Sequence, residues 1–148
     1  MHRVLLAVFL GVALSACGSS PTMPTPPPPL DLTGTWSGDL AAAGVSARMS
    51  WTLTQTASGV TGPVLIAVDT GIVLLNGVLT GTLAGSTLTY TIAVGAGGIP
   101  AQPQCVGQFQ GTMTATTGAA STLAGNYALV SSSCTTPFNG GSLTLTKQ

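Results

Sequence analysis

The chain has 148 residues, of which 45% are hydrophobic and only 4% are charged. Lys and Arg together number three, as do Asp and Glu, so the formal net charge is zero. So few cations exclude the basic patch that binds nucleic acid, and we expect no nucleic-acid partner. The apolar content and the regular patterning after residue 31 exclude a disordered chain.

The N-terminus has the layout of an export signal. Arg3 precedes an apolar stretch at residues 4–13, and Leu14-Ser15-Ala16-Cys17 follows it. The apolar stretch is shorter than the ~20 residues of a membrane-spanning helix. Leu14 to Cys17 resembles the lipobox of bacterial lipoproteins, which implies that a peptidase removes residues 1–16. An ordinary secretory signal followed by a coincidental cysteine is the alternative.

The resemblance also implies that Cys17 carries lipid and anchors the protein to a membrane. In lipoproteins of this kind, an Asp directly after the lipidated cysteine disfavours the outer membrane. Here that residue is Gly18, so we expect an outer-membrane location with the domain facing the periplasm or the cell surface. Residues 17–31 are predicted to form a tether, because six of the ten prolines fall between Pro21 and Pro29. In polyproline II these nine residues span about 28 Å.

Residues 32–148 are predicted to form one all-β domain. Apolar and polar residues alternate along most of it, and no stretch has a convincing helical period. The pattern predicts eight strands, at 33–40, 46–56, 60–68, 72–83, 86–94, 105–116, 122–130 and 142–147. Asn76-Gly77 is a strong turn dipeptide and is expected to interrupt the fourth of them.

Short turns and glycines within the strands favour a single antiparallel up-and-down β-barrel of about eight strands. Gly34-Thr35-Trp36 in the first strand is similar to the G-x-W motif of lipocalins. That resemblance implies a lipocalin-like, or calycin-type, barrel with Trp36 packed across its floor. In lipocalins an arginine near the last strand stacks on this tryptophan, whereas here only Lys147 is nearby. A β-sandwich is the alternative fold.

Cys105 and Cys134 remain once Cys17 is assigned to lipid. The export route is oxidising, so we predict a disulfide between them that closes a loop of about 30 residues. Two buried free thiols are the alternative.

The sequence offers no catalytic constellation. His2 is the only histidine and leaves with the predicted signal peptide, which removes the usual base for a Ser or Cys nucleophile and the usual imidazole ligand of zinc. Asp69-Thr70-Gly71 resembles the triplet of aspartic proteases, but Ile72 follows it where those enzymes have a small residue. We expect a hairpin turn there, and a protein that is not an enzyme, with no catalytic residue, metal or cofactor.

Residues 64–75 are apolar on both faces except at Asp69 and Thr70. Such a hairpin is either a central strand pair covered on both sides or a surface for lipid or a partner protein.

The phase of the strands predicts which side chains face the interior. They are Trp36, Met49, Trp51, Leu53, Tyr90, Ile92, Phe109 and Tyr127. We expect Gly107, Gly111 and Gly125 to leave space beside them. No charged residue alternates inward, so a ligand would be small, apolar and neutral. The ligand-binding candidates are Trp36, Trp51, Tyr90, Phe109 and Tyr127.

Two other functions stay open. In one, the domain is a structural or inhibitor-type module that binds an envelope protein through rim loops such as 95–104. In the other it is a barrel that spans the outer membrane, although the sequence lacks the aromatic girdles of that class.

Overall fold

The structure is a computed structural model that describes residues 30–42, 45–118 and 120–148. The predicted signal peptide at 1–16, the lipidation site Cys17 and most of the tether lie outside these residues. Within the described ranges, no helix is long and apolar enough to cross a membrane.

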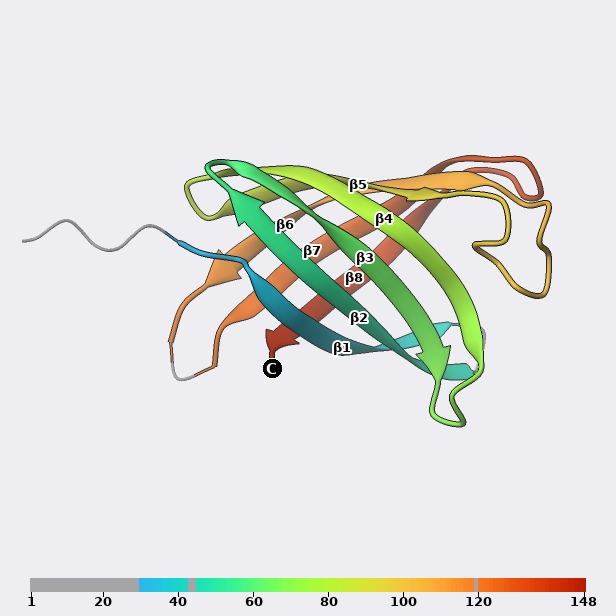
Figure 1. Cartoon of the computed structure of the whole chain (residues 1–148), viewed down its shortest axis with the longest axis horizontal. Helices are drawn as coiled ribbons and strands as arrows, with labels where there is room; N and C mark the ends of the chain where they lie inside the picture. The colour runs from blue at the N-terminus through green and yellow to red at the C-terminus, as the bar shows by residue number, and fades with distance from the viewer. Residues whose placement is uncertain (1–29, 43–44, 119) are drawn as a thin grey trace, which may run out of the picture.

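Eight antiparallel strands in sequence order close into one barrel (Figure 1). The strands are β1 (Gly34–Ala42), β2 (Val45–Thr56), β3 (Gly59–Val68), β4 (Val73–Ala84), β5 (Thr87–Val94), β6 (Gly107–Thr116), β7 (Thr122–Ser132) and β8 (Phe138–Lys147). The up-and-down barrel is therefore confirmed, and the sandwich alternative is wrong. The largest difference from prediction is at β8, which begins at Phe138 rather than at 142.

The predicted interruption at Asn76-Gly77 is wrong, because β4 continues through it. A Cβ on Gly77 would lie 2.8 Å from the carbonyl oxygen of Ala93, so this glycine lets β4 approach β5 closely. The backbone N–H of Asn76 donates to the carbonyl of Gly98 at 2.7 Å, in the loop between β5 and β6. Asn76-Gly77 therefore does not form a turn; it allows close packing between neighbouring strands.

The turn of the β3–β4 hairpin lies at Asp69-Thr70-Gly71, as predicted. Gly71 has a φ of 85°, which a residue with a side chain rarely adopts. The N–H of Gly71 donates to the carbonyl of Val68 at 2.8 Å, and the N–H of Val68 donates to the carbonyl of Ile72 at 3.0 Å. Both Asp69 and Thr70 are exposed.

All eight side chains predicted to face inward belong to the core. Six are buried, whereas Phe109 and Tyr127 are partly buried and pack against the others. The prediction that glycines leave space beside the inward side chains is wrong at Gly111 and Gly125. A Cβ on Gly111 would collide with the carbonyl of Asn126, and a Cβ on Gly125 would collide with the carbonyl of Thr112. These glycines bring neighbouring strands together instead of leaving room for a ligand.

One end of the barrel, which we call the base, is closed by the segment that precedes β1. Leu32 is fully buried there, and its carbonyl accepts a hydrogen bond from Trp36 Nε1 at 2.8 Å. Gln55 of β2 holds the segment in place: its Oε1 accepts from the Leu32 N–H at 2.9 Å, and its Nε2 donates to the Leu30 carbonyl at 3.1 Å. Leu32 therefore acts as a plug for the base.

Lys147 at the end of β8 lies beside Trp36. It pairs with Trp36 across the short β1–β8 seam, and its Nζ lies 5.5 Å from the centre of the Trp36 ring. That distance permits a cation–π interaction. Nζ also donates to the carbonyl of Asp31 at 3.3 Å, which ties the seam to the base.

Candidate ligand-binding site

The other end of the barrel, the mouth, carries the β3–β4 turn and the loops β5–β6 and β7–β8 (Figure 1). A cavity of about 170 Å³ lies inside the barrel on this side. Its floor is formed by the buried side chains Met49, Trp51, Val64, Tyr90, Ile92 and Leu143. Its rim is formed by the more exposed side chains Leu40, Ile66, Leu75, Phe109, Tyr127 and Phe138.

Four of the five predicted ligand residues border this one cavity: Trp51, Tyr90, Phe109 and Tyr127. Trp36 does not join them, because it lies at the base against Leu32. Strand phase alone does not show how far along the barrel axis a residue lies, which is why Trp36 and Trp51 look equivalent in the sequence.

Phe138, which is 49% exposed at the rim, is a lining residue that the sequence pattern does not predict. Asn139-Gly140-Gly141 follows it and has the composition of a loop, so no strand was predicted there. The alternation of Val64 with Ile66 could have identified two further wall residues.

The floor of the cavity is mainly apolar. The rings of Trp51 and Tyr90 meet edge to face, with centroids 5.1 Å apart and planes at 64°. The Tyr90 hydroxyl donates to the carbonyl of Asn126 at 3.0 Å. Burial, with a smaller contribution from the charge of Tyr127, raises the pKa of Tyr90 to about 12, so it stays neutral at ordinary pH.

None of the described residues that line the cavity carries a charge at neutral pH. A charged ligand would lose its hydration there without gaining an opposite charge. The cavity is therefore suited to a neutral apolar molecule.

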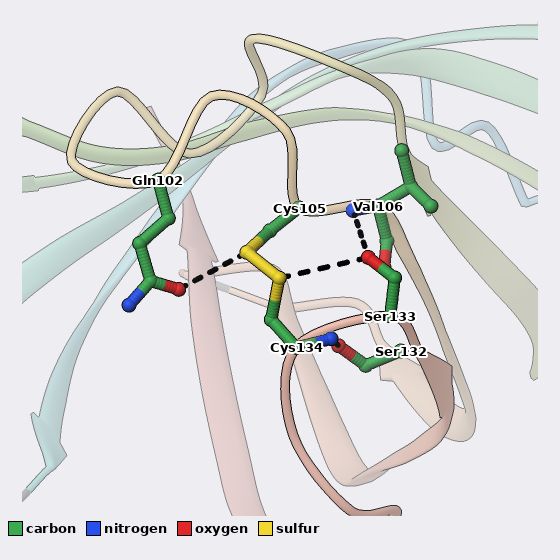
Figure 2. Close-up of a disulfide and its surroundings, with 6 residues drawn as sticks. All are labelled: Gln102, Cys105, Val106, Ser132, Ser133 and Cys134. Carbon is green, nitrogen blue, oxygen red and sulfur yellow. Dashed lines mark hydrogen bonds between the residues drawn. A yellow bond between two sulfur atoms is a disulfide. The ribbon is translucent and has the colours of Figure 1, made fainter.

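The predicted disulfide joins Cys105 to Cys134 at the mouth, with their Cα atoms 5.6 Å apart (Figure 2). The free-thiol alternative is therefore wrong. Ser133 reinforces the link, since its N–H donates to the carbonyl of Val106 at 3.0 Å and its Oγ accepts from the Val106 N–H at 3.1 Å. The disulfide thus fixes the loop that leads into Phe138 at the rim.

A wider hollow of about 580 Å³ lies on the outer surface over β4 to β8. Its walls are mainly threonine and amide side chains that are exposed, such as Thr89, Gln110 and Asn126. A small molecule there would keep much of its surface in water, whereas ligand sites bury most of it. The interior cavity is the better candidate site.

The outer face of the β3–β4 hairpin is apolar and open to solvent. Leu65 is 40% exposed, and it stands opposite Asn76, between Leu74 and Val78 on the neighbouring strand. Val78 is 53% exposed, and Ile72 in the turn is 64% exposed. The hypothesis of a hairpin covered on both sides is therefore wrong. We call Leu65, Ile72, Leu74 and Val78 the outer patch.

The chain matches no protein-family model, and comparison with curated proteins and with solved structures finds no match either. The cavity and the sequence motifs are therefore the grounds on which a function can be proposed.

Proposed function

We propose that this protein is a non-enzymatic lipoprotein of the bacterial envelope whose barrel binds a small, neutral, apolar ligand. The observation that carries the proposal is the uncharged cavity at the mouth, whose lining includes four of the aromatic residues predicted to bind a ligand. Transfer of apolar surface from water into such a cavity is favourable.

The size of the cavity limits the ligand. An engineered apolar cavity of about 150 Å³ in another protein holds one benzene molecule, and this one measures about 170 Å³. A single ring or a short branched chain would fill it. Any larger part of the ligand would extend past Phe138 into solvent.

The anchor is part of the same proposal. Lipid on Cys17 would hold the protein to the outer membrane, with residues 17–31 as the tether. Leu30 lies at the base, so the tether would join the barrel at the end opposite the mouth (Figure 1). The mouth would then face the aqueous phase. Cys17→Ala is expected to abolish labelling with a palmitate analogue and to release the protein from membranes; continued labelling would reject the anchor.

The binding proposal is tested by titrating the mature chain carrying Cys17→Ala with an environment-sensitive apolar probe. We expect a saturable change in tryptophan fluorescence at micromolar probe. Absence of saturation would reject ligand binding.

Two neighbouring residues of β3 provide a matched pair of variants. Ile66 lies at the rim of the cavity, whereas Leu65 lies on the outer face. Ile66→Phe overfills the rim and should weaken binding by about tenfold or more, given the usual cost of overpacking. Leu65→Phe adds the same bulk outside and should leave binding unchanged. Equal effects of the two variants would show that the probe does not enter the barrel.

A second candidate function, binding of an envelope protein, is favoured by the outer patch. Exposed apolar patches often mark protein interfaces. A photo-crosslinker placed at Val78 in intact cells should then capture one defined envelope protein, whereas one at Thr80 on the same strand face should not. Failure of both positions to crosslink would remove this candidate.

A further inference from the structure

Trp51 carries a hydrogen-bond donor that has no partner. Its side chain is fully buried, and Nε1 is the one buried side-chain nitrogen or oxygen without a hydrogen bond among the described residues. Trp36 faces it across the β1–β2 pair and shows the usual arrangement, because its Nε1 donates to the Leu32 carbonyl at 2.8 Å. Buried polar groups are nearly always paired, so an exception needs a physical reason.

No acceptor among the described residues is hydrogen-bonded to Trp51 Nε1. Trp51 lies in the floor of the cavity, where Met49, Val64 and Ile92 are apolar. The other polar group of the floor, the Tyr90 hydroxyl, already donates to the Asn126 carbonyl. The Trp51 side chain therefore lines the cavity, while its unpaired Nε1 is covered by neighbouring side chains.

We infer that the ligand of this cavity carries one hydrogen-bond acceptor, such as a ketone, ester or ether oxygen, and that Trp51 Nε1 donates to it. This inference rests on the proposed function and narrows its ligand class. A carboxylate would also accept, but no cation lines the cavity to balance its charge. The ligand is thus a ring-sized apolar group with a neutral oxygen at its buried end.

Trp51 Nε1 has almost no solvent-accessible surface. Side chains of the floor must therefore move apart when the oxygen arrives. Met49 lies two residues from Trp51 on the same face of β2, and its unbranched side chain has the rotational freedom to do so.

Two probes of equal size separate the oxygen from the bulk: acetophenone, which has a ketone, and α-methylstyrene, which has a CH₂ group in its place. The affinities of both are measured for the chain with Cys17→Ala and for the same chain with Trp51→Phe added. The difference in hydration between the probes enters the affinity ratio of both chains equally, so it cancels when the two ratios are compared. Trp51→Phe should shift this ratio against acetophenone by about fivefold, the worth of one net hydrogen bond. Trp36→Phe should leave the ratio unchanged.

Indole N–H signals in ¹⁵N NMR spectra of the chain with Cys17→Ala give a second readout that needs no variant at Trp51. Acetophenone should move the Trp51 signal downfield and leave that of Trp36 in place, whereas α-methylstyrene should cause no downfield shift. If both probes bind with the same effect on the Trp51 signal and the affinity ratio is unchanged by Trp51→Phe, the inference is overturned while ligand binding stands. If neither probe binds, the proposed function fails with it.

Discussion

Removal of the disulfide is the perturbation whose magnitude follows most directly from the structure. Cys105 and Cys134 are 29 residues apart in the sequence. A cross-link over such a loop lowers the entropy of the unfolded chain and stabilises the fold by about 3.5 kcal/mol at 25 °C. Cys105 is also buried, so its replacement by alanine removes packing in addition to the link. The double variant Cys105→Ala/Cys134→Ala should therefore lose slightly more stability than the reduced wild type.

Urea unfolding at 25 °C measures both losses on the same scale. We expect lower midpoints for the reduced wild type and for the double variant, and a larger dependence on urea because their unfolded chains expose more surface. A loss below about 1 kcal/mol in both samples would refute the loop-closure argument. A large loss in the variant alone would assign the effect to the packing of Cys105.

Three further predictions concern the base and the core. Leu32→Ala should reduce the free energy of unfolding by about 2–5 kcal/mol, since it empties a fully buried site; a smaller loss in urea unfolding would mean that the base is not plugged by this residue. Lys147→Met should reduce the free energy of unfolding by about 0.5–1 kcal/mol, because it removes the cation over Trp36. Lys147→Arg keeps a cation there and should leave the free energy of unfolding nearly unchanged; equal losses in the two variants would argue against the cation–π contact. The raised pKa of Tyr90 stabilises the folded state fully below pH 10, and this contribution is lost as pH rises towards 12. The melting temperature of the wild type should therefore fall more steeply than that of Tyr90→Phe between these values, and parallel curves would contradict the assignment.

The fold could be predicted from the sequence because the two-residue alternation of apolar and polar side chains matches the two faces of a β-strand. Residues two apart share a face of a strand, so alternation shows which of them are buried. All eight inward side chains follow from this rule, including Trp51 in the middle of β2. The turn at Asp69-Thr70-Gly71 could also be predicted, because the conformation of a turn depends on the few residues within it.

Glycines show where local reasoning ends. Asn76-Gly77 has the composition of a turn, yet it lies within β4 because a neighbouring strand approaches Gly77 closely. Gly111 was expected to leave empty space, but the carbonyl of Asn126 occupies it. In both cases the deciding contact comes from a residue that is distant in the sequence.

The strand count and the inward phase of the aromatic strands could be read from the residues alone, because both depend on a short-range period. The pairing of Cys105 with Cys134 could be predicted once the lipobox resemblance had assigned Cys17 to lipid. How far along the barrel axis each side chain lies became visible in the closed barrel alone. The closed barrel placed Trp36 at the plugged base and Trp51 in the floor of the cavity, with its donor unpaired. The physical reason is that axial position depends on the stagger between neighbouring strands as the barrel closes, which is a property of the whole sheet and of no single segment.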